Sequence, residues 1–166
     1  DCQTILEEIQ NELGYHGPLR LMCCPAAAST MVSGLYRTLL LLTRQDYPIM
    51  TLKMIFRPEL VHVMRHDLWD KHLRVAVSTV HWFHPIIHWM VRAADRDLEI
   101  SCDERVTRQK DKAFRIQYSE AIFEVLQQGV GRRFLFTTGF CNEKKTLMQR
   151  FSAIFDTVRK PRGAVV

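Results

Sequence analysis

Glu59 and His62 are the two side chains of this sequence whose types and spacing best suit chemistry. They stand three residues apart in a stretch that we expect to be helical, so both lie on one face of the helix. A carboxylate in that position can accept a proton, and an imidazole can bind a metal ion. The same E-x-x-H spacing also arises by chance around an ordinary surface or core histidine. The pair therefore needs support from the rest of the chain.

The residue before Glu59 affects how the pair is interpreted. In the H-E-x-x-H pattern, two histidines four residues apart share a metal ion, and the glutamate between them activates a bound water. Pro58 stands here where the first histidine would be, and proline cannot bind metal. Proline also lacks a backbone N–H and crowds the preceding turn of a helix. We therefore expect the helix to break within a residue or two of Arg57.

A second group of acidic side chains lies further along the chain. Glu99 and Asp103 are four apart on an expected helix, so one could bind a metal while the other orients a histidine. His66, four residues after His62, is an alternative ligand that could join His62 and Glu99, or else an exposed histidine at a helix end. Residues 81–88 combine three histidines with aromatic side chains. They suggest a packed helix corner, which could rest on a membrane interface, with a metal site as the alternative.

Three motifs follow one another along the chain: E-L-x-H-x-x-x-x-D-L from Glu59, H-W-F-x-P from His81 and R-D-x-E-x-x-C-D-E from Arg96. In this order they resemble the zinc-peptidase domain of the BlaR/MecR antirepressor family, which are membrane-embedded sensor-transducers of β-lactam resistance. The likeness includes residues 30–37, the final helix and the basic residues after it. It therefore covers nearly the whole chain, and the combination is more specific than any one motif.

The resemblance implies a gluzincin-like zinc-peptidase fold in which two crossing helices supply the site. The resemblance implies that Glu59 is the general base and that His62 and Glu99 are zinc ligands. It also implies that Asp103 contacts one of these ligands without binding the metal itself. His66 is a possible substitute ligand. Because Pro58 replaces the first histidine, zinc is expected to bind weakly or not at all. Two functions stay open, namely a pseudo-protease impaired in zinc binding and catalysis, and an active zinc endopeptidase that leads to repressor inactivation.

The resemblance also implies a setting. The domain would lie at the cytoplasmic face of a bacterial membrane as part of an integral membrane protein, with residues 159–166 as a basic tail leading towards a membrane helix. Its partner would be a transcriptional repressor or another protein substrate. The sequence identifies no small-molecule ligand.

Composition agrees with one folded domain spanning residues 1–166, since 47% of the residues are hydrophobic and 25% are charged. The formal charge of +5 is modest and no nucleic-acid-reading motif accompanies it, so we expect no direct contact with nucleic acid. The five cysteines form an odd number without a C-x-x-C pair, which favours reduced thiols of a cytoplasmic protein. No signal peptide and no uninterrupted apolar span of about 18 residues is evident.

Hydrophobic periodicity predicts a mostly helical α+β domain with a small sheet near the N-terminus. Residues 34–42 are expected to form a strand, although their leucine run also suits a helix. Asp46 is a plausible N-cap of the helix that leads to Glu59. The other expected elements are helices over 2–13, 68–80, 86–108, 112–128 and 143–158 and strands over 19–23 and 133–138, with 25–29 as a turn.

Overall fold

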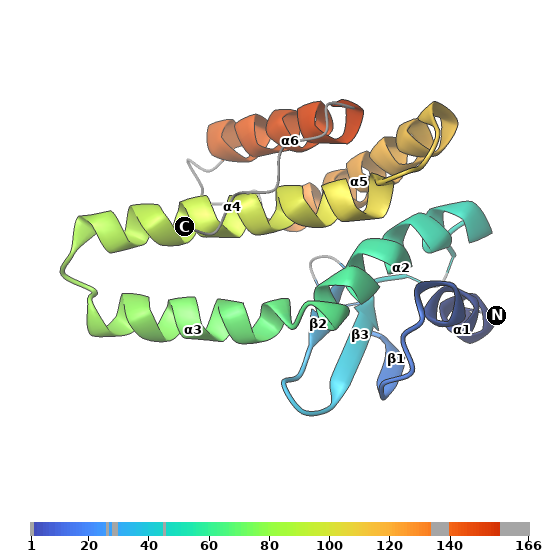
Figure 1. The fold of residues 1–166 in the computed structure, drawn as a ribbon, viewed down its shortest axis with the longest axis horizontal. Helices are drawn as coiled ribbons and strands as arrows, with labels where there is room; N and C mark the ends of the chain where they lie inside the picture. Colours follow the sequence, from blue (N-terminus) through green and yellow to red (C-terminus); the bar gives the residue numbers. More distant parts are fainter. Residues whose placement is uncertain (1, 26, 28–29, 45, 134–139, 157–166) are drawn as a thin grey trace.

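The computed structural model describes residues 2–25, 27, 30–44, 46–133 and 140–156, and within them the side chains outside 126–145. The architecture is α+β and mostly helical, as predicted (Figure 1). The elements in chain order are α1 (Cys2–Leu13), β1 (Leu19–Cys23), β2 (Met31–Ser33), β3 (Thr38–Leu42), α2 (Ile49–Met64), α3 (Asp67–Val80), α4 (Pro85–Thr107), α5 (Lys112–Arg133) and α6 (Phe140–Phe155). The expected strand over 133–138 and the tail over 159–166 lie outside the described residues, apart from Arg133, which ends α5.

The sheet has the order β1-β3-β2, with β3 parallel to β1 and antiparallel to β2. Leu40 is paired with Leu21 on one side and with Val32 on the other. The strand predicted over 34–42 is shorter than expected because Gly34 turns the chain between β2 and β3. Gly34 has φ +88°, and a Cβ there would clash with the carbonyl oxygen of Arg37. The short edge strand β2 was missed by the sequence analysis as a separate element.

Helix α2 lies between two hydrophobic cores. Leu52, Phe56 and Leu60 belong to the core shared with α1 and the sheet. Met54 and Val61, on the other side of the same helix, belong to the core shared with α4, α5 and α6. The helix is therefore buried on two sides, and it fixes the position of the N-terminal sheet relative to the C-terminal helices.

The predicted break near Arg57 is wrong, because α2 continues from Ile49 through Pro58 to Met64. Packing outweighs the proline here. Phe56 and Leu60 flank Pro58 and are fully buried, and burial of each contributes about 1.5–3 kcal/mol, against about 3 kcal/mol for a proline inside a helix. Arg57 is also held to Glu12 of α1 by two hydrogen bonds of 2.7 and 2.6 Å. Pro58 is thus a local cost that the surrounding core tolerates.

Replacing Pro58 with alanine is expected to raise the free energy of unfolding by about 2 kcal/mol. The helix would regain a hydrogen bond and lose a clash, while the unfolded chain would gain some freedom. Urea unfolding followed by circular dichroism measures the change. Pro85→Ala is the matched control, because Pro85 stands in the first turn of α4, where proline fits. An unchanged or lower stability of Pro58→Ala would show that Pro58 costs the helix nothing.

Other predicted boundaries also need correction. Asp46 does not cap α2, which follows Pro48 without a side-chain cap. Helix α5 passes its predicted end at residue 128, continues through Gly129 and Gly131 and reaches Arg133, since a glycine costs a helix only about 1 kcal/mol. Helix α6 spans Phe140–Phe155 rather than 143–158. Within the described part of the chain, no helix is both long and apolar enough to cross a membrane.

Candidate functional site

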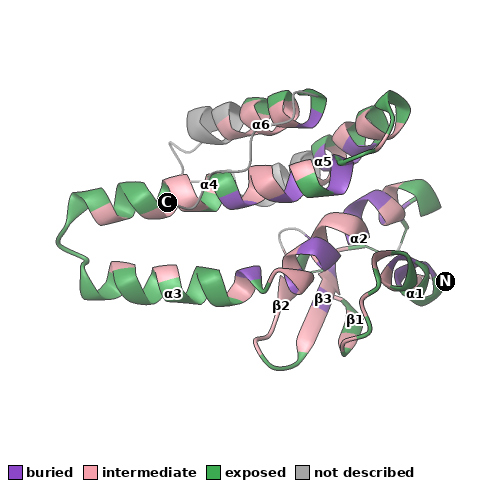
Figure 2. Ribbon diagram, in the orientation of Figure 1, coloured by how far each residue is buried: buried purple, intermediate pink, exposed green. Residues whose placement is uncertain are grey.

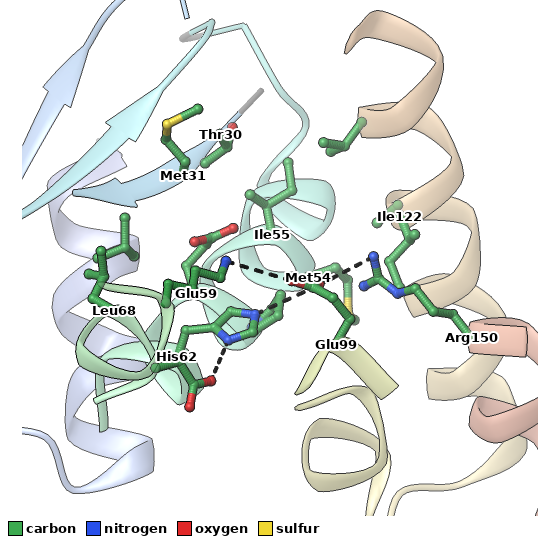
Figure 3. Close-up of a pocket in the computed structure, with 16 residues that line it drawn as sticks. Thr30, Met31, Met54, Ile55, Glu59, His62, Leu68, Glu99, Ile122 and Arg150 are labelled. Carbon is green, nitrogen blue, oxygen red and sulfur yellow. Dashed lines mark hydrogen bonds and ion pairs between the residues drawn. The ribbon is translucent and has the colours of Figure 1, made fainter. Parts of the chain in front are cut away.

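A pocket of about 390 Å³ lies where α2 meets β2, α3, α4, α5 and α6 (Figure 3). Its ionisable side chains come from α2, α3, α4 and α6, and its apolar side chains come from α2, α3, α5 and β2. The lining residues are Thr30, Met31, Val32, Met54, Ile55, Pro58, Glu59, His62, Asp67, Leu68, Lys71, Glu99, Ala121, Ile122, Val125 and Arg150. The structure thus brings Glu59, His62 and Glu99 to one pocket.

His62 is held in a defined orientation by Asp67. Its Nδ1 lies 2.7 Å from the Asp67 carboxylate, which is 3% exposed at the start of α3. Its Nε2 lies 3.9 Å from Oε2 of Glu99 on α4. A carboxylate bound to one ring nitrogen fixes the tautomer and directs the other nitrogen towards a ligand. Asp67 therefore leaves Nε2 of His62 free to accept or bind in the pocket.

Asp67 is a site residue that the sequence analysis did not identify as one. It follows the end of α2, and His66 between the two helices has φ 59°, in the left-handed region. That turn brings Asp67 back beside His62, which a straight helix would not do at a spacing of five residues. Nε of Arg65 also lies 3.3 Å from Asp67, so an ion pair joins these two residues at the helix end.

His66 does not share a helical face with His62. The premise of a ligand pair at helical spacing is wrong, because α2 ends at Met64 and His66 stands in the left-handed turn before α3. Its side chain is exposed and is not part of the pocket lining. The helix end therefore separates the two histidines.

Glu59 points into the pocket beside β2 (Figure 3). Burial and the nearby carboxylate of Glu99 raise its pKa to about 8, while Lys71 and a backbone hydrogen bond from Val32 act in the opposite direction. At neutral pH the Glu59 carboxyl is therefore mostly protonated in the metal-free protein. A general base needs the ionised form, so this environment disfavours that role without an additional positive charge.

Two cations face the carboxylate of Glu99. Nη1 of Arg150 lies 3.5 Å from its Oε2, and Nζ of Lys71 lies 3.9 Å from its Oε1. Neither cation was identified from the sequence, because Arg150 is 51 positions from Glu99 and the two meet only when α6 packs on α4. The spacing of Lys71 from the motif helix carries no signal of its own. Together they supply positive charge beside the acidic groups of the pocket.

Asp103 lies behind this group rather than beside a histidine. It is fully buried and accepts hydrogen bonds of 2.6 and 2.9 Å from Arg150 and one of 2.8 Å from the Tyr118 hydroxyl. Burial and the Asp103 carboxylate raise the pKa of Tyr118, so its hydroxyl stays protonated and donates. Asp103 therefore positions Arg150 against Glu99, whereas the carboxylate that holds His62 is Asp67.

The donor atoms fit a zinc-peptidase site only in part. His62 and Glu99 offer a nitrogen and an oxygen 3.9 Å apart, close to the separation of about 3.3 Å that two ligands of a tetrahedral zinc ion require at about 2.0–2.2 Å from the metal. Pro58 lines the pocket one turn before His62 and has no donor. Among the described residues, no group of three or more His, Cys, Asp or Glu side chains could hold a metal ion.

Comparison with known proteins places this geometry in context. Residues 1–154 match the protein family described as BlaR1 peptidase M56. A regulatory protein BlaR1 of Bacillus licheniformis is 24% identical over 123 residues, which is 73% of this chain and 20% of that protein. The chain thus spans about a fifth of the length of this curated relative. No solved structure matches significantly.

Proposed function

Because the chain belongs to the BlaR1 peptidase M56 family, we propose that it is the metallopeptidase-like domain of a membrane-bound antirepressor of the β-lactam-resistance type, impaired in zinc binding and catalysis. One observation carries the proposal. Pro58 stands in the pocket lining at the position from which the first histidine of H-E-x-x-H would reach the metal. The loss of one of three protein ligands weakens a zinc site by several kcal/mol, out of about 10–16 kcal/mol for four-ligand structural sites.

The charges around Glu99 support the same proposal. Arg150 and Lys71 lie 3.5 and 3.9 Å from its carboxylate, so two side-chain cations offset part of the negative charge that a metal ion would otherwise neutralise. The buried Asp103 fixes Arg150 in this place by two hydrogen bonds. A metal ion at Glu99 would have to compete with these contacts.

In this role the domain acts through binding rather than cleavage. It would receive a signal from the parent protein at the cytoplasmic face of the membrane and pass it to a repressor or another protein. A gluzincin-like fold, with α2 and α4 supplying the site, would serve as the scaffold for that contact. Residues 1–166 would form a single domain of the larger protein, with residues 159–166 leading towards a membrane helix.

An active zinc endopeptidase is the second candidate, and one observation favours it. Asp67 holds His62 at 2.7 Å through Nδ1 and leaves Nε2 directed at Glu99, as a ligand pair needs. In that case zinc would supply Lewis-acid activation of water, with Glu59 as the base. A third protein donor would still be required, and the described residues around the pocket do not provide it.

Zinc analysis combined with a cleavage assay distinguishes the two functions. The 166-residue chain is dialysed against zinc, its metal content is measured, and it is incubated with a peptide library and with purified repressors of the β-lactam-resistance type. We expect less than stoichiometric zinc and no cleavage above that of Glu59→Gln. Stoichiometric zinc, together with cleavage that Glu59→Gln abolishes, would establish the active endopeptidase instead.

A further inference from the structure

The antiparallel pair of helices α3 and α4 projects away from the sheet, and its outer half has no core of its own (Figure 1). From Trp69 to Met90 every side chain is exposed or half-buried (Figure 2). The corner expected at 81–88 is therefore not packed within the described part of the chain, since Trp82, Phe83 and Trp89 are exposed. The other part of that expectation, a contact with a membrane interface, stays a prediction. Helical segments that contribute nothing to a core are usually covered with polar residues, and this segment is not.

Exposed apolar side chains lie along both helices and in the turn between them. On α3, Trp69, Leu73, Val77 and Val80 follow one another at intervals of four, four and three residues. On α4, Ile86, Trp89 and Met90 follow at intervals of three and one, so each set occupies one helical face. The exposed fractions of Trp82, Phe83 and Trp89 are 73%, 66% and 70%. We call the part of this apolar surface next to the turn the hairpin tip; it consists of Val77, Val80, Trp82, Phe83, Ile86, Trp89 and Met90.

The ionisable side chains of the hairpin between residues 71 and 94 are all basic. Residues 71–94 contain no Asp or Glu, but they contain Lys71, Arg74 and Arg92 in addition to four histidines. Lys71 faces Glu99 in the pocket, so Arg92 is the cation of this range that lies nearest to the turn. The acidic side chains Asp70 and Asp95 begin only at the base of the hairpin, where Arg74 lies 3.0 Å from Asp95. A large apolar surface marks a contact site, and the absence of acidic residues fits an anionic partner rather than a mixed protein surface.

Two further features favour a lipid surface. Tryptophan and phenylalanine at the end of an element, followed along the chain by the cation Arg92, match the interfacial zone of a bilayer, where the rings lie at the headgroup level. Arg92 is exposed and lies seven residues along α4 from Pro85, a rise of about 10 Å. That distance matches the depth of about 5–10 Å to which interfacial helices bury their apolar faces.

We propose that the hairpin tip inserts into the headgroup region of an anionic lipid bilayer. Trp82, Phe83 and Trp89 enter the boundary between headgroups and acyl chains, and Arg92 remains at the level of the phosphates. The pocket with His62 and Glu99 lies at the opposite end of α3 and α4, so membrane contact leaves it accessible. This inference stands on the surface of the hairpin and does not depend on whether the pocket binds zinc.

Vesicle sedimentation tests the proposal with the 166-residue chain. Sucrose-loaded vesicles of phosphatidylcholine with one third phosphatidylglycerol should bind the chain, and pure phosphatidylcholine vesicles should bind it more weakly. The double variant Trp82→Ser/Phe83→Ser should lower the partition coefficient by about tenfold or more, because the apolar contribution is lost. Arg92→Glu should weaken binding only to the anionic vesicles. Phe123→Ser/Met148→Ser, at exposed apolar positions of α5 and α6, is the matched control.

Circular dichroism verifies that each variant remains folded, and sedimentation equilibrium without lipid tests for a second copy of the chain as the occupant. A monomer that binds anionic vesicles through Trp82 and Phe83 supports the proposal. Equal vesicle binding by the hairpin and control variants overturns it. So does a dimer that the double variant converts to monomer while vesicle binding stays absent, because the tip would then be a protein interface.

Discussion

Replacing Asp103 with asparagine is expected to lower the free energy of unfolding by about 3–5 kcal/mol. Asp103 is fully buried and is the shared acceptor for Arg150 and Tyr118. The asparagine keeps the shape but removes the charge, and the guanidinium of Arg150, whose side chain is only 16% exposed, loses its principal counter-charge. The contacts between α4, α5 and α6 weaken together because the three residues come from these three helices.

The matched control is Asp97→Asn, on the same helix. Asp97 is 68% exposed and lies 3.3 Å from Arg96, and exposed pairs of this kind contribute about 0–1 kcal/mol. Urea unfolding at pH 7 compares the two variants with the parent chain. If Asp103→Asn and Asp97→Asn destabilise the protein equally, the buried network does not hold the helices together as described.

The second large effect concerns the pH dependence of stability at Glu59. Burial raises the pKa of Glu59 from 4.5 to about 8, with a further contribution from Glu99. Between these two values the folded state holds a proton that the unfolded state has lost, so the free energy of unfolding falls as the pH rises through this range. The Glu59→Gln variant does not titrate. It should therefore match the parent near pH 4 and exceed it by about 4–5 kcal/mol above pH 8.

Urea unfolding between pH 4 and pH 9 in the presence of EDTA measures this difference. Chelation matters because a bound cation would favour the ionised carboxylate and remove the effect. Glu120→Gln, at an exposed position of α5, corrects for the loss of one carboxylate, so that the comparison isolates the environment of Glu59. A constant difference between Glu59→Gln and the parent across this range would mean that Glu59 ionises as readily in the folded chain as in the unfolded one.

Local patterns predicted the elements whose formation depends on local sequence. The helix over 2–13 was predicted with both ends, because Ile5, Leu6 and Ile9 form one buried face and Gly14 with φ 70° ends it. The strand over 19–23 was also predicted. By contrast, the local conformational preferences of proline predicted a break of the helix at Pro58. The helix continues there because α2 is buried on two sides. Neither core could be read from the spacing of residues within α2.

The pocket also contains residues that were predicted from the sequence and residues whose place depends on tertiary packing. Glu59, His62 and Glu99 were selected by motif order, and the structure places all three around one cavity. Asp67 was not predicted as a site residue. Its contact with His62 depends on the left-handed conformation of His66, and sequence patterns rarely indicate that conformation at a residue other than glycine. Arg150 escaped notice because its position is set by packing between α4 and α6.

The measurement that tests the central claim most directly is a zinc titration by isothermal calorimetry of the parent chain and two variants at Pro58. Pro58→His adds the missing donor, whereas Pro58→Ala relieves the helix without adding one. We expect Pro58→His to bind one zinc ion at least about 100-fold more tightly than the parent, which corresponds to about 3 kcal/mol. Pro58→Ala should bind no better than the parent. Stoichiometric, equally tight binding by the parent chain and Pro58→His would contradict the proposal that Pro58 disables the metal site.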